Sequence, residues 1–236
     1  MKRLHLPRAH EGERSVDGAP FHHLARVLRV KAGDVLEVFD GEGQLFDAKV
    51  SRLDADALTL NLSNARAAPA LAPLTLIQGL PKGDKLEQVL QKGTELGAFA
   101  FIPVVTDRAV SRPKDPLAKA QRWQKIAAEA ARQCGRADVP KVAPPCTLAE
   151  AVAALAAGTQ VLVLDEEEKT VRLTDVASSG PLALVIGPEG GLTRDEVKSL
   201  REKGAQTVTL GPRILRTETA ALAALSVLLH VHGELG

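Results

Sequence analysis

The sequence is poor in the residues that build aromatic platforms, disulfide frameworks and membrane spans. Its 236 residues include no tyrosine, one tryptophan and two cysteines. Recognition of unpaired bases by a platform of stacked rings is therefore not expected. Cys134 and Cys146 lack the spacing of metal ligands, so we predict that they are reduced thiols of a cytoplasmic protein. No apolar run is long enough to cross a bilayer, and no signal peptide is expected, which argues against a membrane partner.

Several common catalytic signatures are also missing. The sequence has no Gly-x-Gly-x-x-Gly after a strand, no Gly-x-x-x-x-Gly-Lys-Ser/Thr loop and no Gly-x-Ser-x-Gly elbow. These absences argue against the usual dinucleotide site, against nucleotide hydrolysis and against a serine hydrolase. His22 and His23 are adjacent but have no matching cluster of ligands, so we predict a surface role for them and no metal site.

The net charge of +1 conceals an uneven distribution of charged residues. Residues 1–31 contain seven Lys or Arg against three Asp or Glu, and residues 108–141 contain nine against three. Residues 165–202 are acidic instead, with nine acids against five bases. Two basic segments and one acidic segment suggest a polyanion-binding face beside a cofactor region, although an ordinary solvated surface explains the same pattern.

Two domains are predicted, at 1–68 and 74–236, joined by a linker at 69–73 that is rich in alanine and proline. In the first domain, the pattern predicts an amphipathic helix over 21–30 and strands over 35–39, 44–53 and 57–62. A hairpin turn at 40–43 joins the first two strands. Short antiparallel strands with one helix favour a small barrel, a fold that often binds nucleic acid but also serves other functions.

The second domain alternates strands and helices, which is typical of an α/β fold with a mainly parallel sheet. Strands are expected at 74–78, 98–105, 161–164, 182–186 and 208–210. Helices are expected at 84–96, 116–134 and 148–157, after Thr193, and after 219 up to about 231.

The strongest functional signal is a pair of loops that follow buried strands. The first loop, Gly187-Pro188-Glu189-Gly190-Gly191, comes after the apolar run 182–186 and precedes a helix that Thr193 and Glu196 begin as a capping box. Ligands of α/β proteins bind outside the carboxyl ends of parallel strands. Glycines alone would also fit a tight turn that binds no ligand, so the prediction of a ligand site depends on the second loop.

That second loop, 211–219, repeats Gly-Pro after a strand and places Arg216 and Glu218 at the start of an apolar helix. Charges are costly to bury unless they are paired or used. In the alternative interpretation, Thr217 caps the helix, Glu218 favours its dipole and Arg216 is solvated, but the repeated Gly-Pro is then unexplained. A further charged stretch at 81–85 either contacts phosphate or begins a helix that Asp84 caps.

Five stretches of the chain resemble, in order, motifs of the RsmE family, the bacterial 16S ribosomal RNA uridine-N3 methyltransferases of the SPOUT superfamily. They lie at 78–85 (QGLPKGDK), 91–97 (QKGTELG), 129–136 (EAARQCGR), 186–191 (IGPEGG) and 210–220 (LGPRILRTETA). His23, the stretch 27–29 and the pair 33–34 resemble that family's N-terminal domain. The resemblance covers nearly the whole chain, and the last two motifs together are specific. Gly93 departs from the family pattern at a position with no expected catalytic role.

The resemblance implies a trefoil-knotted, mainly parallel sheet with helices on both faces, preceded by a PUA-like barrel that binds RNA. It also implies a homodimer with the knots at the interface, and 16S ribosomal RNA or the small ribosomal subunit as partner. S-adenosylmethionine is the implied cofactor, bent among three loops. The residues implied to bind it are Leu164, Gly187, Pro188, Glu189, Gly190, Leu210, Gly211, Ile214 and Leu215.

Methylation of the uracil imide nitrogen requires the loss of its proton. A carboxylate can accept that proton while an arginine stabilises the anion on the ring. We therefore expect Arg216 to stabilise charge and Glu218 to accept the proton, with Glu189 as the alternative acceptor. A SPOUT enzyme for transfer RNA or a ribose hydroxyl, and a non-enzymatic RNA-binding module, stay open. The expected RNA contacts are Arg8, His23, Arg26, Arg29, Lys31, Lys82, Arg108, Arg112 and Arg136.

Overall fold

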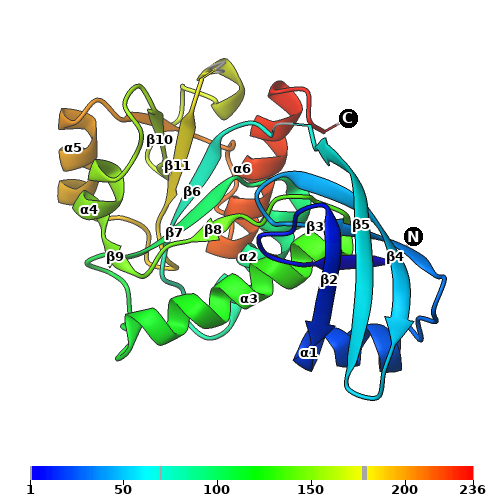
Figure 1. The fold of residues 1–236 in the computed structure, drawn as a ribbon. Helices are drawn as coiled ribbons and strands as arrows, with labels where there is room; N and C mark the ends of the chain where they lie inside the picture. The colour runs from blue at the N-terminus through cyan, green and yellow to red at the C-terminus, as the bar shows by residue number, and fades with distance from the viewer. Residues whose placement is uncertain (1, 70, 177–179, 236) are drawn as a thin grey trace. The chain divides into compact units, whose positions relative to one another are not determined.

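The computed structural model describes residues 2–69, 71–176 and 180–235 and divides into two compact units (Figure 1). The first unit comprises Met1–Ala70 together with Ala131–Val139, and the second comprises Leu71–Ala130 together with Pro140–Gly236. The short segment from the middle of the chain was not expected in the first unit. The domain boundaries at 68 and 74 stay a prediction.

The first unit is a half-barrel. Within the described residues, its five-stranded sheet has the order β1-β3-β4-β5-β2. The strands are β1 (Arg3–His5), β2 (Gly12–Asp17), β3 (Val35–Phe39), β4 (Gln44–Leu53) and β5 (Ala57–Ala67). Alternation along β5 buries Leu58, Leu60 and Leu62, as expected for a strand with one face on a core. The helices α1 (Gly18–His22) and η1 (His23–Val27) add Phe21 and Leu24 to that core.

Polar contacts fix the central hairpin of this unit. The Asp40 carboxylate accepts hydrogen bonds from the amides of Glu42 and Gln44, at 2.7 and 2.9 Å, which confirms the turn expected at 40–43. The segment from the middle of the chain joins here, because the Val139 amide donates to the Gly41 carbonyl and the Gly43 amide donates to the Ala137 carbonyl.

The second unit is a doubly covered parallel sheet, so the α/β fold expected for a SPOUT methyltransferase is confirmed. Within the described residues, its strands follow the order β12-β10-β11-β6-β7-β8, with β9 paired to β7. All of these pairings are parallel. The strands are β6 (Leu74–Gly79), β7 (Ala100–Val105), β8 (Lys141–Val142), β9 (Cys146–Thr147), β10 (Gln160–Leu164), β11 (Leu182–Ile186) and β12 (Gln206–Val208).

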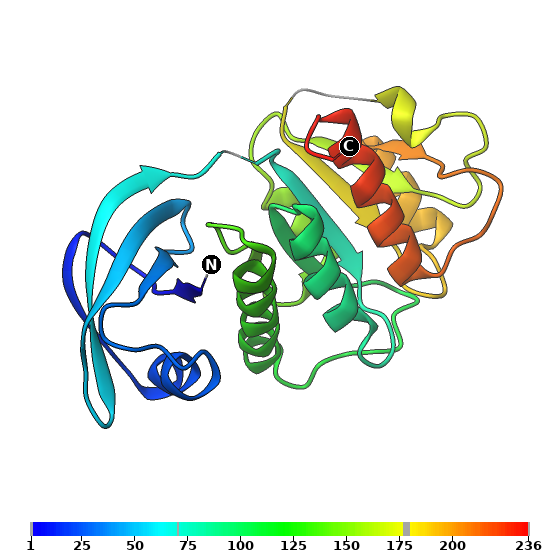
Figure 2. The ribbon, with the colours of Figure 1, turned by 90° about the vertical axis from the view of Figure 1, so that its right-hand side faces the viewer.

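Helices cover both faces of this sheet. Helices α4 (Leu148–Ala153) and α5 (Arg194–Glu202) pack on one face, where Ala183 and Val185 of β11 point. Helices α2 (Lys85–Leu96) and α6 (Thr217–Val231) lie side by side on the other face (Figure 2). Strand β11 is buried along its whole length because it is covered on both faces. The long helix α3 (Pro116–Cys134) and the short η2 (Leu173–Val176) complete the fold.

Small residues allow α2 and α6 to approach the sheet closely. A Cβ on Gly93 of α2 would lie 2.9 Å from the ring of Phe101 and 3.3 Å from Leu225 of α6. The departure of Gly93 from the family motif therefore has a packing role, because a side chain there would push the helix away from β7.

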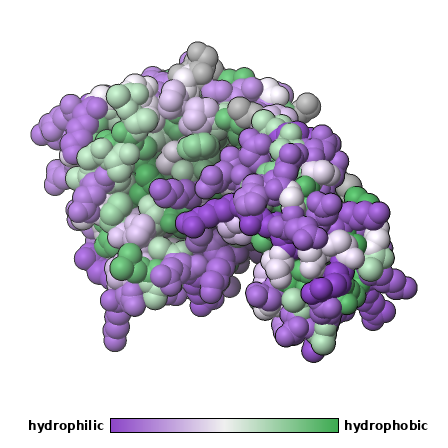
Figure 3. Space-filling view, in the orientation of Figure 1, coloured by the Kyte–Doolittle hydropathy of each residue, from purple (hydrophilic) through white to green (hydrophobic). Residues whose placement is uncertain are grey.

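Hydrophilic side chains cover most of the face seen in Figure 3, and apolar side chains gather on it over the region of α4 and β9–β11. Of the helices in the described ranges, none combines the length and apolarity needed to cross a bilayer. The knot that the resemblance implies stays a prediction, and it would depart from the general rule that chains do not thread their own loops.

Candidate active site

A cavity of about 340 Å³ lies where β10, β11 and β12 end. Its volume falls within the range of small-molecule sites, and the carboxyl ends of parallel strands are where α/β folds bind ligands. Its lining residues come from three segments and are Leu164, Asp165, Glu166 and Lys169; Ile186, Gly187, Pro188, Glu189, Gly191, Leu192 and Arg194; and residues 208–217 with Ala220.

The loop after β11 is folded so tightly that its first glycine has no room for a side chain. A Cβ on Gly187 would lie 2.7 Å from the carbonyl carbon of Gly191 and 2.9 Å from the amide nitrogen of Leu192. Gly79, at the end of the neighbouring β6, would place a Cβ 2.6 Å from Pro188. The capping box predicted for Thr193 and Glu196 is confirmed and fixes the start of α5 directly after this loop.

A buried chain of hydrogen bonds ties this loop to the start of α6. The Thr217 hydroxyl donates to the Gly187 carbonyl at 2.6 Å, and the Gln78 side-chain amide donates to the Thr217 hydroxyl at 2.8 Å. Thr217 therefore does not cap α6. The N-cap position belongs to Arg216, whose side chain makes no capping hydrogen bond.

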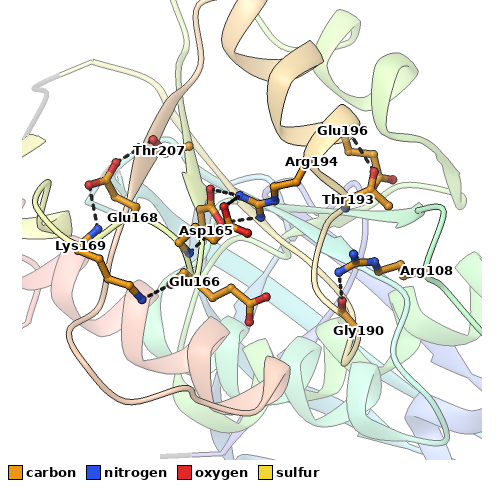
Figure 4. A network of polar contacts seen from close by, with 11 residues as sticks. Arg108, Asp165, Glu166, Glu168, Lys169, Gly190, Thr193, Arg194, Glu196 and Thr207 are labelled. Carbon is orange, nitrogen blue, oxygen red and sulfur yellow. Dashed lines mark hydrogen bonds and ion pairs between the residues drawn. The ribbon is translucent and has the colours of Figure 1, made fainter.

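The third wall of the cavity is the loop after β10, which carries four consecutive acids (Figure 4). Asp165 binds the Arg194 guanidinium through both carboxylate oxygens, at 2.7 and 2.9 Å. Burial is the largest single influence on Asp165 and opposes its ionisation, but the hydrogen bonds from Arg194 and the Glu167 amide, together with the Arg194 charge, hold the pKa of that carboxyl below its usual value. The loop after β10 is thereby fastened to the first turn of α5.

Glu168 stabilises the same loop from within. Its carboxylate accepts hydrogen bonds from the amide and hydroxyl of Thr170, from the Val171 amide and from the Thr207 hydroxyl of β12. These bonds lower the pKa of Glu168 to about 2, the Thr170 amide contributing most. Lys169 donates to the Glu166 carbonyl across the loop, and Arg108 donates to the Gly190 carbonyl at 2.8 Å (Figure 4).

The loop after β12 carries two arginines and an exposed isoleucine. Arg213 and Arg216 are exposed, and neither side chain forms a hydrogen bond or ion pair with any residue of the described ranges. Ile214 between them is 84% exposed, which is unusual for an isoleucine in a folded domain. All three line the cavity, so two unpaired cations and an apolar side chain face a ligand or partner there.

Lys85 joins two carboxylates beside these arginines. Its ammonium group lies 2.8 Å from Glu189 of the glycine loop and 3.7 Å from Glu218 of α6. The Glu189 carboxylate also accepts hydrogen bonds from the Lys82 amide. Burial is the largest single influence on Glu189 and opposes its ionisation, but the hydrogen bonds from Lys85, from its own amide and from the Lys82 amide, together with the Lys85 charge, lower its pKa.

The structure brings together most of the residues predicted to bind the cofactor. Leu164, Pro188, Glu189, Leu210 and Leu215 line the cavity, as do Gly187, Gly211 and Ile214. Gly190 is the exception, because it is not among the lining residues, and a Cβ on it would meet the Arg108 side chain at 3.3 Å. Of the two predicted catalytic residues, Arg216 lines the cavity, whereas Glu218 is not among the lining residues and lies next to Lys85.

The residues predicted to contact RNA are divided between the units. In the first unit, Arg8, Arg26, Arg29 and Lys31 are exposed, whereas the His23 Nε2 atom is buried without a hydrogen-bond partner within the part of the chain described. Arg136 is not a surface cation, because its side chain is 8% exposed and pairs with Asp138 at 2.5 Å. In the second unit, Lys82, Arg108 and Arg112 are exposed.

Sequence reasoning missed several residues that shape the site. Asp165 and Arg194 are far apart in the chain, and nothing in the pattern pairs them. Gln78 and Lys85 belong to the motif at 78–85, so the motif marked them without indicating their contacts. Among the residues described, no group of three or more His, Cys, Asp or Glu is arranged to hold a metal ion.

The cavity fits S-adenosylmethionine by its size and its bare backbone. Gly211 lines it, and a Cβ there would meet no described atom within 4 Å, so the backbone is open to a close approach by a ligand. Carboxylates at 165, 166 and 189 suit the positive charges that this cofactor carries.

Comparisons with known proteins agree with this geometry. The model of an RNA methyltransferase domain matches residues 68–229, and that of an RNA methyltransferase PUA domain matches residues 16–63. The ribosomal RNA small subunit methyltransferase E of Bacillus subtilis is 39% identical over 229 residues, covering 91% of this chain and 88% of the relative.

Two similar solved structures contain the cofactor. The ribosomal RNA small subunit methyltransferase E of Neisseria gonorrhoeae, bound to S-adenosylmethionine, is 33% identical with a TM-score of 0.89 and covers 98% of each chain. A putative methyltransferase of Legionella pneumophila in complex with the same cofactor is 28% identical with a TM-score of 0.86, covering 97% of each chain.

Proposed function

Since the chain belongs to the RsmE family of S-adenosylmethionine-dependent RNA methyltransferases, we propose that it methylates the N3 imide nitrogen of a uridine in 16S ribosomal RNA. The observation that carries this proposal is the unpaired Arg216 on the cavity wall, beside the group formed by Glu189, Lys85 and Glu218. A permanent cation and an available carboxylate are what removal of an imide proton requires.

The three loops around the cavity would hold the cofactor. Gly187 and Gly211 offer backbone without side chains, and Leu164, Leu210 and Leu215 offer apolar contacts. When bound, S-adenosylmethionine supplies an activated methyl group, so the protein's part is to bind, orient and balance charge. The hydrogen bonds of Asp165 and Glu168 would keep the loop after β10 in place, so that the site needs little rearrangement on binding.

Arg216 and Glu218 would act on the uracil ring. Loss of the imide proton leaves negative charge on the ring carbonyls, and a guanidinium can stabilise it without losing its own proton. Glu218 would accept the proton. Glu189 is less suited to that role, because the donors around it lower its pKa. A covalent nucleophile is not required, which agrees with a cavity lining that contains neither Cys134 nor Cys146.

The exposed cations of the first unit would contact RNA phosphates, with Arg8, Arg26, Arg29 and Lys31 as the contacts. Lys82, Arg108 and Arg112 of the second unit would also contact RNA. The enzyme would act in the cytoplasm as a homodimer, on 16S ribosomal RNA or on the small subunit that contains it.

Mass mapping of RNA from a deletion strain tests the proposal. We expect one uridine of 16S ribosomal RNA to lose a methyl group, and the wild-type gene but not the Arg216→Ala variant to restore it. Methylation at N3 blocks the pairing edge of the base and stops reverse transcription, whereas a ribose methyl protects the neighbouring bond from alkali. A missing methyl group in transfer RNA, or on a ribose, would overturn the proposed specificity.

A further inference from the structure

We propose that Lys85 is a positioning residue that holds Glu189 as a fixed anion and leaves Glu218 free to accept the uracil proton. This inference rests on the proposed function, since it assigns a division of labour between the two carboxylates of the same site. Its basis is the unequal way in which the described residues satisfy Glu189 and Glu218.

Glu189 is surrounded by donors. Its Oε1 atom accepts from the Lys85 ammonium at 2.8 Å and from the Lys82 amide at 3.1 Å, and the same amide lies 3.3 Å from Oε2. A carboxylate with this many charge-assisted and backbone bonds favours its ionised form and gives up lone pairs that a proton would need. Glu189 is therefore a structural anion of the glycine loop.

Glu218 has the opposite environment. Its Oε2 atom is buried and accepts no hydrogen bond from the described part of the chain. The nearest cation is the Lys85 ammonium at 3.7 Å, which is an ion pair beyond hydrogen-bond length. Such a carboxylate is kept near a positive charge and retains its capacity to accept a proton.

Four charged groups from three elements lie close together around Lys85, and their two positive and two negative charges cancel. Lys85 projects from α2, Glu189 from the loop after β11, and Glu218 from the first turn of α6, where Arg216 occupies the N-cap position. The carboxylates of Glu189 and Glu218 raise the affinity of Lys85 for its proton, and Arg216 opposes this, so Arg216 acts within the same electrostatic group. Removing any one charge must change the ionisation of the remaining groups.

The two neighbours of Glu218 provide opposite perturbations. In Lys85→Met, Glu218 loses its cation and faces the Glu189 anion alone, which disfavours the charged form of its carboxyl. In Glu189→Gln, the like charge disappears and Lys85 is released toward Glu218, which favours the charged form of the Glu218 carboxyl. Lys92→Met is the matched control, because Lys92 lies on the same helix and pairs with Glu95.

Two measurements test these opposite shifts. Carbon-13 NMR of the cofactor-free protein, labelled at the glutamate carboxyls, would report the titration of Glu218 without any catalysis. Single-turnover methyl transfer as a function of pH should show its acidic limb moving upward in Lys85→Met and downward in Glu189→Gln. Lys85→Arg should retain most of the wild-type profile, and Lys92→Met all of it. Calorimetric titration with S-adenosylmethionine shows whether each variant still binds the cofactor.

Each outcome decides the proposal. Opposite shifts in both measurements support it. A Glu218 titration that neither variant moves would overturn it, and so would a Lys85→Met enzyme that loses rate equally at every pH, because Lys85 would then have only a structural role. Absence of methyl transfer in the wild-type protein would instead reject the proposed function, and the NMR titration would still test the role of Lys85.

Discussion

The hydroxyl of Thr217 donates a buried 2.6 Å hydrogen bond to the carbonyl of Gly187, which joins the start of α6 to the loop after β11. Thr217→Val keeps the shape of the side chain but leaves the Gly187 carbonyl and the Gln78 amide without this partner. A buried polar group that loses its partner costs about 1–3 kcal/mol, and we expect that loss in the free energy of unfolding.

The same variant should also bind S-adenosylmethionine more weakly, because the glycine loop is no longer fixed against α6. Chemical denaturation and calorimetric titration measure the two effects. Thr217→Ser, which retains the hydroxyl, should restore most of both. Thr219→Val is the matched control, since Thr219 is exposed on the same turn. Equal stability of the Val and Ser variants at position 217 would show that the bond is not stabilising.

A second prediction contrasts two glycines of one loop. Gly187→Ala places a Cβ against backbone atoms of Gly191 and Leu192, which a side-chain movement cannot relieve. We expect it to abolish measurable cofactor binding and to lower stability by about 1–3 kcal/mol, the usual cost of overpacking. In Gly190→Ala the nearest neighbour of the added Cβ is the Arg108 side chain, at 3.3 Å, so the variant should change stability by less than about 0.5 kcal/mol. Thermal shift with and without cofactor would compare them, and equal losses in both variants would contradict the assignment.

A third prediction concerns pH. The pKa of Glu168 is about 2 in the folded protein, against an ordinary value of 4.5 for a glutamate, so its ionised form is stabilised by folding. That contribution is present above the unfolded value and is lost as the pH falls from about 4.5 toward 2. We therefore expect wild-type protein to be more stable than Glu168→Gln at pH 7, and the difference to shrink progressively below pH 4.5. Urea denaturation between pH 7 and 3 measures it, and a difference independent of pH would refute the role.

Much of the fold could be predicted because its local signals agree with the tertiary structure. The strands at Val35–Phe39, Gln44–Leu53 and Leu182–Ile186 and the helix at Pro116–Cys134 have the bounds that periodicity predicts. The edge strands β1 and β2 were missed because their short, charged sequences carry no alternation. The strand predicted at 208–210 begins and ends earlier, because β12 spans Gln206–Val208 and the backbone of Thr209 pairs instead with that of Val171.

The site could be predicted only in part, for a physical reason. Glycine loops after buried strands have a local signature, and nearly all of their predicted residues line the cavity. Lys85, Gln78 and Asp165 act through partners about 30 to 140 positions away, and only the parallel order of the strands brings these pairs together. The prediction for Arg136 was wrong in the opposite way. Its basic segment suggested an RNA-binding surface, but the fold places its guanidinium against Asp138.

A fourth prediction concerns RNA binding by the first unit. Arg26→Glu combined with Arg29→Glu should weaken binding to ribosomal RNA and flatten its salt dependence, because each lost phosphate contact reduces the logarithmic slope by about 0.7–0.9. Cofactor affinity should not change. Arg52→Glu is the control, since Arg52 is exposed on the same unit but pairs with Asp54. Filter binding at several salt concentrations measures the slope, and an unchanged slope in the double variant would mean that this surface is only solvated.

The last prediction concerns Arg216. Its guanidinium lies on the cavity wall without an ion-pair partner in the described ranges, so it is available to a developing anion and needs no prior exchange of partners. Removing one charge-stabilising donor typically costs a factor of about 10²–10³ in rate, and we expect Arg216→Ala to lower methyl transfer on that scale. Arg216→Lys should restore only part, because a point charge does not reproduce the planar fork.

Single-turnover kinetics at saturating RNA isolates that chemical step from binding. Calorimetry should show nearly normal affinity of Arg216→Ala for S-adenosylmethionine, since the contacts proposed for the cofactor are made by other residues of the cavity lining. Arg213→Ala is the matched comparison, because Arg213 lines the same cavity three residues away and is also unpaired within the described chain. A normal rate constant in Arg216→Ala together with a large loss in Arg213→Ala would transfer the charge-stabilising role to Arg213. Normal rates in both variants would mean that neither arginine stabilises the anion. The remaining cation near Glu218 is then Lys85, whose ammonium group lies 3.7 Å from its carboxylate.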